Sequence, residues 1–415
     1  MPGRNSTADS TVVSFDPYEL KDVVGGTIRD PYPAMHALRR ISPVHSGPID
    51  LGEGAEPADP NRPAPVTVLG YDEVVQVLRD GETYSSTIYE EVMGMVMGRT
   101  ILQMDEPEHR SIRTLIASSF RSKMLERWEE DLVERVVNEL IDTFIDEGRA
   151  DLVRSVTFNF PVQVIARILG LPREDYPKFQ RWTLELTSVA ANWERGIASS
   201  AALRDYFADV MEERRARPGD DLISDLVRTE VEGRHLTDEE TFSFLRLRLP
   251  AGVETTYRAT GSMLFGLLND RDQFDALYKD RSLFPQAFEE AIRWEPPVCV
   301  ILRRATREVE LAGVKIENGA DLALLIGAAN RDERKYPEPD RYDMFREQRQ
   351  HVGFGFGVHV CLGMHLARMD SCIAVNTLLD RLGPFTLDPE ADAPHIEGMA
   401  FRSPLSLPVV FSPGG

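Results

Sequence analysis

Cysteine is scarce in this chain of 415 residues, which contains only Cys299, Cys361 and Cys372. Three cysteines are too few for a disulfide framework, and no CxxC pair offers the usual spacing of a structural zinc site. The composition therefore excludes the small disulfide-rich secreted class of proteins. It agrees with a reducing compartment, and we expect a cytoplasmic location.

Long apolar runs and an excess of basic charge are also missing. No stretch approaches the ~20 apolar residues that a membrane helix needs, and the N-terminal MPGRNSTADSTVVSF has no apolar signal core. The chain has 47 Lys and Arg against 68 Asp and Glu, a net charge of -21. This charge disfavours nonspecific attraction to nucleic acid or anionic lipid. We expect a soluble protein with neither a membrane anchor nor a nucleic-acid partner.

The patterns that are present predict a mainly α protein. Hydrophobic residues make up 42% and charged residues 28%, which is typical of a folded chain with a sizeable core. VTVLGY predicts a strand and DEVVQVLRD a short helix, which indicates a small β-rich subdomain. No repeat or Ser-rich linker divides the chain, so we predict a disordered N-terminus at 1–15 and a single domain at 16–415. Amphipathic stretches predict helices over Glu108 to Phe120, Leu125 to Glu147, Val162 to Ile168, Tyr176 to Ala191 and Ala201 to Arg215.

One longer helix is expected after His235. Thr237 and Glu240 have the spacing of a capping box, and the roughly thirty residues that follow would extend about 45 Å, enough to cross a domain. Pro250 and Gly252 lie inside this segment, so we expect a local kink or a broken hydrogen bond there.

The segment HVGFGFGVHVCLGMHLARMD has the most informative chemistry. Gly353, Gly355 and Gly357 would let the backbone approach a flat ligand closely. The start of the following helix would favour the thiolate of Cys361 through its positive dipole end. Two other interpretations stay open: a buried cysteine in a Gly-rich turn, and a zinc site using His359, Cys361 and His365.

Phe354, Gly357, His359, Cys361 and Gly363 reproduce, in order and spacing, the haem-binding signature of the cytochrome P450 superfamily. The chain resembles the bacterial, soluble, ferredoxin-dependent type from about residue 16 to residue 410. This resemblance implies a triangular, mainly α fold with a small β-rich side, haem b as cofactor, and Cys361 as the axial iron ligand.

Two further segments resemble structural motifs of that family. In FEEAIRWEPPV, Glu290 and Arg293 stand three residues apart and so share one helix face. By itself this spacing is a common surface ion pair, but its place before the cysteine matches the family's Glu-Arg pair. In PDRY, Arg341 falls where the resemblance implies a third member that binds this pair and helps hold the cysteine loop.

The long helix contains Ala251, Gly252, Glu254 and Thr255, which resemble the family's acid-alcohol segment above the iron. The resemblance implies that Gly252 leaves room for dioxygen, that Thr255 hydrogen-bonds to the bound oxygen, and that Glu254 relays protons from solvent. A helix cap or an ordinary polar face is the alternative. The acid is Glu where other members have Asp, and Pro250 directly precedes the segment.

Basic residues at family positions predict a site for the two haem propionates. His109 and Arg113 are four residues apart on one helical face, Arg303 follows the Glu-Arg helix, and His359 lies in the cysteine loop. A buried haem needs such groups to neutralise its carboxylates.

No flavin, nicotinamide or iron-sulfur segment is recognisable, and the GFGFG run lacks the context of a dinucleotide loop. The resemblance implies a separate ferredoxin and ferredoxin reductase, so NAD(P)H would act only through these redox partners. A basic patch of Arg110, Arg121, Lys123 and Arg368 is the hypothesis for the docking site.

The sequence thus predicts a haem-thiolate monooxygenase that inserts one atom of O2 into a hydrophobic small molecule. A peroxide-driven peroxygenase and a non-catalytic haem or ligand-binding protein are the rivals. The predicted substrate-pocket residues are mostly apolar: Ile88, Val92, Met93, Val96, Met97, Trp182, Leu186, Trp193, Leu247, Val298, Val300, Ile301 and Phe401.

Overall fold

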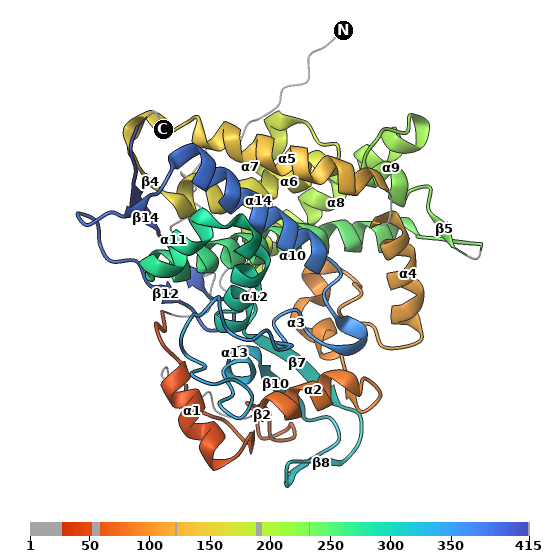
Figure 1. Ribbon diagram of the computed structural model, residues 1–415. Helices are drawn as coiled ribbons and strands as arrows, with labels where there is room; N and C mark the ends of the chain where they lie inside the picture. The colour runs from red at the N-terminus through yellow and green to blue at the C-terminus, as the bar shows by residue number, and fades with distance from the viewer. Residues whose placement is uncertain (1–26, 52–58, 121–122, 188–192, 232, 414–415) are drawn as a thin grey trace.

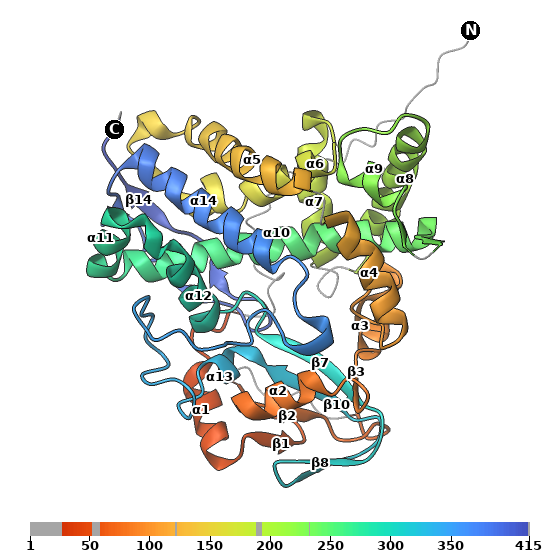
Figure 2. The ribbon, with the colours of Figure 1, turned by 45° about the vertical axis from the view of Figure 1, so that its right-hand side comes forward.

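The computed structural model describes residues 27–51, 59–120, 123–187, 193–231 and 233–413. Figures 1 and 2 show a large helical body and a smaller part in which strands gather beside α1 and α2. The mainly α fold with a β-rich part is therefore confirmed. The predicted disordered segment 1–15 lies outside the described residues.

Fourteen α-helices are assigned in the described residues. In chain order they are α1 Tyr32–Ile41, α2 Tyr71–Arg79, α3 Ile88–Met97, α4 Glu108–Phe120, α5 Lys123–Ile141, α6 Phe160–Ile168, α7 Tyr176–Thr187, α8 Trp193–Ala216, α9 Leu222–Leu226, α10 Asp238–Leu268, α11 Arg271–Lys279, α12 Phe284–Trp294, α13 Ile326–Asn330 and α14 Met364–Leu382.

The largest sheet has five strands in the order β1-β2-β10-β7-β3. Strand β10 pairs with β2 in parallel and with β7 in antiparallel register. Its strands are β1 Val44–Ser46, β2 Val66–Val68, β3 Tyr84–Ser85, β7 Val300–Ala305 and β10 Asp321–Leu325. The smaller sheets contain β4 Arg149–Asp151, β5 Glu230–Val231, β6 Arg234–His235, β8 Val309–Leu311, β9 Val314–Ile316, β11 Thr386–Leu387, β12 Ile396–Glu397, β13 Ser403–Pro404 and β14 Pro408–Val410.

Helix α10 runs through the middle of the helical body, where it contacts α6, α12 and α14 (Figure 2). Its 31 residues start at the predicted capping box, in which the Thr237 hydroxyl accepts from Glu240 N–H and the Glu240 carboxylate accepts from Thr237 N–H. The helix continues through Pro250 as one element, because the surrounding helices bury it on most of its faces. This central position places α10 against α14, the helix that follows Cys361.

Several helix boundaries differ from the sequence prediction. Helix α4 has the predicted bounds, but α5 ends at Ile141, because the chain turns through a short 3-10 segment to Gly148, which has a φ of 68°. Helix α8 begins at Trp193, eight residues before the predicted Ala201. Within the described ranges, no helix combines the length and hydropathy needed to span a membrane.

Candidate active site

Cys361 lies in a tight loop that precedes α14. Its backbone N–H donates to the Phe354 carbonyl at 2.9 Å. Gly355 and Gly357 have φ values of 72° and 71°, a backbone region in which glycine is favoured. A Cβ on Gly357 would lie 2.5 Å from the Leu78 carbonyl oxygen at the end of α2. The close approach that we predicted for a flat ligand is therefore, at this glycine, an approach to protein backbone.

The prediction of a close approach to a flat ligand also needs correction at Gly353, because a Cβ there would lie 2.5 Å from the Ile292 side chain of α12. Gly363 differs, since nothing lies within 4 Å of the position of its missing side chain. The loop from Gly353 to Gly363 is thus packed between α2 and α12, while open space remains beside Gly363, and Cys361 is exposed. Such an arrangement fits a flat group placed against the cysteine.

The pKa of the Cys361 thiol is raised, although the sequence analysis expected the helix dipole to favour the thiolate. Desolvation by the surrounding protein atoms has the largest effect, although the side chain keeps an exposed surface, and it outweighs the backbone N–H of Gly363 and the charges of Arg248, Arg113 and Arg368, which lower the pKa. Cys361 lies three residues before α14 begins at Met364, where the dipole is weaker. A metal cation bonded to the sulfur would stabilise the thiolate.

The four basic residues predicted for the propionates cluster beside this loop. The rings of His109 and His359 are 4.1 Å apart, and His359 Nε2 lies 3.0 Å from the Ser86 hydroxyl. Arg113 donates to the Val360 carbonyl at 2.6 Å, and the buried Arg303 donates to the Leu302 carbonyl at 2.7 Å. Sequence-distant basic groups from α4, β7 and the cysteine loop therefore meet.

Among the described residues, Glu106 beside His109 is the one carboxylate that forms an ion pair with these four groups. Burial, followed by the charges of Arg303, His109 and Arg113, lowers the pKa of His359 to about 3. His109 Nε2 is buried with no hydrogen-bond partner, and its Nδ1 faces Glu106 at 3.3 Å. An unpartnered buried ring nitrogen beside the cations Arg113 and Arg303 fits a ligand with two carboxylates. The residues present thus fit haem, with sulfur for its iron and cations for its propionates.

The Glu290 carboxylate binds Arg293 as predicted, at 2.7 and 2.8 Å, but its third partner differs. Arg346 Nε donates to Glu290 at 3.2 Å. The prediction for Arg341 was wrong: its side chain is exposed, and only its backbone carbonyl accepts from Arg293. The loop after Pro339 turns back on itself, so Arg346, five residues after Arg341, reaches the Glu290–Arg293 pair.

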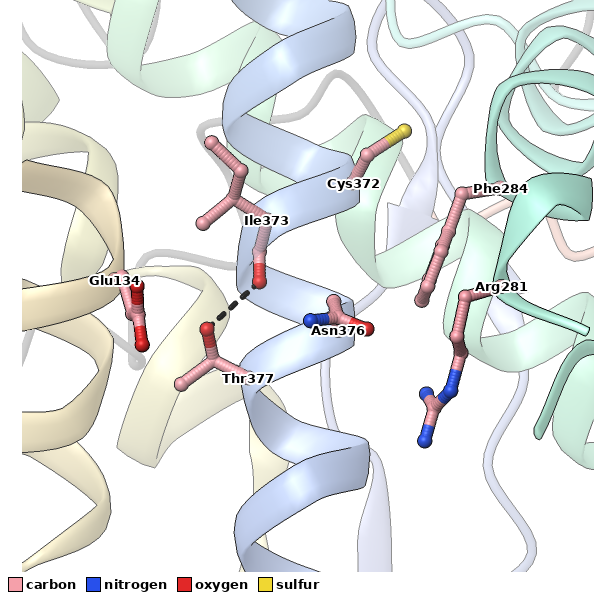
Figure 3. A pocket seen from close by; sticks show the side chains of 7 residues that line it. All are labelled: Glu134, Arg281, Phe284, Cys372, Ile373, Asn376 and Thr377. Atoms are coloured by element: carbon pink, nitrogen blue, oxygen red, sulfur yellow. Dashed lines mark hydrogen bonds between the residues drawn. The ribbon is translucent and has the colours of Figure 1, made fainter. Parts of the chain in front are cut away.

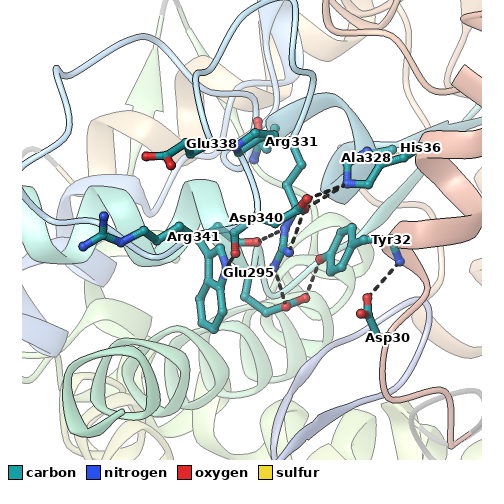
Figure 4. Close-up of polar contacts among 12 residues, drawn as sticks. Asp30, Tyr32, His36, Glu295, Ala328, Arg331, Glu338, Asp340 and Arg341 are labelled. Carbon is teal, nitrogen blue, oxygen red and sulfur yellow. Dashed lines mark hydrogen bonds and ion pairs between the residues drawn. The ribbon is translucent and has the colours of Figure 1, made fainter. Parts of the chain in front are cut away.

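Figure 4 shows Arg341 extending away from a neighbouring network around Glu295. Glu295 accepts from Arg331 at 3.0 Å, from Arg402 at 2.6 Å and from Tyr32 at 2.5 Å. Sequence reasoning missed this network because its members come from four distant segments. It ties α1 and the C-terminal strands to the end of α12.

On α10, Arg258 joins the acid-alcohol segment through its ion pair with Glu254. The Thr255 hydroxyl donates to the Ala251 carbonyl at 2.6 Å. Glu254 is buried, and one of its oxygens accepts from Arg258 Nη2 at 3.1 Å and Nε at 3.2 Å, while Oε1 has no partner. Arg258 also donates to Ser403 at 3.0 Å. Glu254 is therefore sealed from solvent in an ion pair, and the predicted proton relay would need this pair to open.

Comparison with known proteins agrees with this geometry. The family model for cytochrome P450 matches residues 62–403. The chain belongs to the cytochrome P450 family.

Relatives and solved structures cover nearly the whole chain. Mycinamicin IV hydroxylase/epoxidase from Micromonospora griseorubida is 36% identical, with 95% of this chain and 98% of the relative covered. The steroid C26-monooxygenase of Mycolicibacterium smegmatis is 32% identical over 86% of this chain and 90% of its own length. CYP109E1 from Bacillus megaterium in complex with testosterone has a TM-score of 0.82 at 30% identity, covering 92% and 99%. The enzyme class is that of a P450 monooxygenase, and the family implies haem and O2.

The residues predicted to line the pocket of this P450 fall into two groups. Ile88, Val96, Met97, Leu186 and Leu247 are buried where α3, α7 and α10 meet the core. Met93, Trp182, Val298, Val300, Ile301 and Phe401 are partly buried, and Val298 pairs with Phe401 in a β-bridge. Val92 and Trp193 are 50% and 46% exposed, so the structure places them at the surface.

The structure also bears on two other hypotheses, the basic docking patch and the zinc site. Arg368 is bound to Glu289 at 2.5 Å and Arg110 to Glu106 at 3.1 Å, so these members of the proposed basic patch are already paired. Arg121 and the side chain of Lys123 lie outside the described residues. For the zinc alternative, no group of three His, Cys, Asp or Glu side chains in the described segments could hold a metal ion.

A pocket of about 440 Å³ lies elsewhere in this P450, between α5, α14 and the segment before α12 (Figure 3). Its lining contains none of the predicted site residues. Phe284 and Arg281 face Cys372 and Asn376 of α14, with Glu134 on the opposite side. Arg281 pairs with Asp380 at 3.3 Å, so the basic group of this pocket already has an acidic partner.

Proposed function

We propose that this P450 inserts one oxygen atom from O2 into a hydrophobic small molecule, using haem b whose iron is bound by the Cys361 thiolate. Cys361 would hold the haem iron through its sulfur, and the bound haem would supply oxygen activation. Electrons come from NAD(P)H through a ferredoxin reductase and a ferredoxin. The proposed location is the cytoplasm.

The single observation that carries the proposal is the pairing of an exposed cysteine with an under-neutralised basic cluster. Cys361 ends a loop fixed by its own N–H bond to Phe354 and by glycines packed on α2 and α12. His109, Arg113, Arg303 and His359 gather beside that loop, and His109 Nε2 is buried without a partner. Anchored sulfur and adjacent cations match the iron and the two propionates of one porphyrin.

The residues of α10 have separate tasks in this proposal. Ala251 is exposed, and the Thr255 hydroxyl donates to its carbonyl, which leaves the lone pairs of the hydroxyl free to accept a hydrogen bond and so to hold a proton of the relay. Glu254 is held in place by Arg258, and it can carry protons toward the site once this ion pair opens. Buried apolar residues such as Val96 and Leu247 exclude water and orient the substrate.

The names of the relatives support a hydrophobic substrate. One is a steroid C26-monooxygenase, another is a mycinamicin hydroxylase/epoxidase, and a similar structure contains testosterone. These compounds belong to those proteins, and the substrate proposed here is defined only by its apolar character.

The test is oxygen incorporation in a reconstituted system. Purified protein is combined with a ferredoxin, a ferredoxin reductase, NAD(P)H and 18O2, and a hydrophobic compound that displaces water from ferric iron serves as substrate. We expect one 18O atom in the product and none with Cys361→Ala. Product formed only with added peroxide would instead support a peroxygenase, and haem binding without any product would support a ligand carrier.

A further inference from the structure

Arg246 on α10 is a buried cation whose hydrogen-bonding capacity is only partly used. Its side chain is 8% exposed. Nη1 donates to the Ser200 hydroxyl at 3.2 Å and Nη2 to the Ser243 hydroxyl at 3.4 Å, which are neutral partners. Nε is buried and has no hydrogen-bond partner among the residues that the structure describes. The edge formed by Nε and Nη2 therefore has donors to spare.

The nearest carboxylate compensates this charge incompletely. Glu239 lies 3.7 Å from Arg246 Nη2, but its side chain is 60% exposed and also binds Arg204 at 2.9 Å. The pKa of Arg246 is lowered, chiefly by burial and further by Arg204, and Glu239 only partly opposes this effect. A buried cation with a weak partner destabilises the fold, and an anion bound to it would recover that free energy.

The position of Arg246 connects it to the predicted substrate pocket. A Cβ on Gly98 would lie 2.6 Å from Nη2, so the guanidinium packs against the end of α3. The Ser200 hydroxyl that binds Arg246 also donates to the Val96 carbonyl. Leu247 is the next residue on α10. Arg246 thus borders the buried pocket residues Val96 and Leu247 at the junction of α3, α8 and α10.

We propose that Arg246 anchors the carboxylate of an elongated apolar acid, the substrate class of this P450. This inference rests on the proposed function. A carboxylate can accept from Nε and Nη2 together, the fork arrangement that favours Arg over Lys. Arg246 precedes Thr255 by nine residues, which is about 13 Å along the helix axis. The acid must therefore have an apolar body on the order of 10 Å long, which a fatty acid has and benzoate lacks.

The experiment compares dodecanoic acid, methyl dodecanoate and benzoate as ligands of the haem-loaded protein by titration calorimetry. For the wild type we expect the acid to bind about tenfold or more tightly than its ester, because the ester cannot form the charge-assisted hydrogen bonds that the carboxylate accepts from the guanidinium. Arg246→Gln should remove this preference while leaving ester affinity within about twofold. Arg246→Lys should keep part of it, since the charge stays and the fork is lost.

Arg204→Gln is the matched control, because Arg204 shares Glu239 but its side chain is 47% exposed. It should retain the acid preference. Equal wild-type affinity for acid and ester overturns the proposal, and so does an equal loss of both ligands in Arg246→Gln, which would mark a purely structural cation. If Arg246→Gln does not fold, the wild-type and Arg246→Lys comparisons decide. A missing haem-thiolate spectrum contradicts the proposed function separately, because calorimetry needs no such spectrum.

Discussion

At the scale of single residues, the site is organised by buried charges and by the partners that each one has. Glu254 and Arg258 are 2% and 1% exposed and neutralise each other within one helix. In the part of the chain that the structure describes, the basic residues around His359 have one ion-pair partner, the partly exposed Glu106, which is why a dianionic ligand suits them. Arg246 lies between these cases, with a distant, exposed carboxylate. Buried charges with a close partner of opposite sign support the fold, whereas buried charges with a weak partner are candidates for binding a ligand.

Thr255→Ala should uncouple the reaction. Without the hydroxyl that now donates to Ala251, NAD(P)H and O2 would still be consumed, but product per NAD(P)H should fall roughly tenfold or more and peroxide should rise. The measurement is product and peroxide per NAD(P)H in the reconstituted system. Thr255→Ser keeps a hydroxyl and serves as control. Unchanged coupling in Thr255→Ala would remove this residue from the relay.

Arg258→Met should destabilise the fold more than the double variant with Glu254→Gln. Loss of Arg258 leaves a buried carboxylate without a cation, which costs about 3–5 kcal/mol, whereas neutralising both partners avoids that cost. Denaturant unfolding of both variants measures the difference. If the single and double variants are equally stable, the ion pair does not neutralise Glu254 as described.

At the scale of elements, the cysteine loop is held from both sides. Gly357 packs on the end of α2 and Gly353 on α12, while Glu290 of α12 binds the loop that contains Arg346. The contacts of Arg293 with the carbonyls of Asn330, Pro339 and Arg341 extend this support to α13 and the next loop. Rigid support at several points keeps the sulfur of Cys361 in one position.

Arg346→Ala and Arg341→Ala form a matched pair that tests this support. The Arg346 side chain is 9% exposed and binds Glu290, so its loss should cost roughly 2–3 kcal/mol and lower haem content. The side chain of Arg341 is exposed, and its loss should change stability by about 0.5 kcal/mol or less. Unfolding curves and the haem-to-protein ratio measure both effects. A larger effect for Arg341→Ala would reverse the assignment.

Periodic elements were predictable from the sequence, whereas irregular segments were not. Helix α4 and the capping box of α10 follow from local patterns that tertiary contacts do not override. Arg346 could not be chosen over Arg341, because spacing carries no geometric information in a loop without regular structure. Arg258 could have been found, since it stands four residues after Glu254 on the same helix face. The upward shift of the Cys361 pKa depends on desolvation by protein atoms that the fold brings around the sulfur, which spacing does not show.

At the scale of the whole molecule, acid stability depends on carboxylates that the fold keeps ionised. Burial alone would raise the pKa of Glu289, but hydrogen bonds from His351 and Arg368 outweigh it and hold the pKa at about 2. This pairing joins α12 to the cysteine loop and to α14. The molecule therefore has an acid-sensitive link between the elements that surround Cys361.

Glu289→Gln should flatten the acid limb of stability. A carboxylate with a lowered pKa stabilises the folded state above its unfolded pKa, near 4.5, and this contribution is lost as pH falls toward about 2. The free energy of unfolding, measured from pH 7 to the lowest pH at which the protein folds, should fall less steeply below pH 4.5 in the variant. Identical slopes for variant and wild type would show that Glu289 is not so paired.

The absorption spectrum of the reduced, carbon monoxide-bound protein tests most directly whether the Cys361 sulfur binds a haem iron. We predict a stoichiometric haem with the red-shifted Soret band of a sulfur-ligated iron, and loss of that band in Cys361→His with haem retained by the basic cluster. A purified wild-type protein without haem, or with a Soret band typical of nitrogen ligation, would contradict the assignment of Cys361 as the iron ligand.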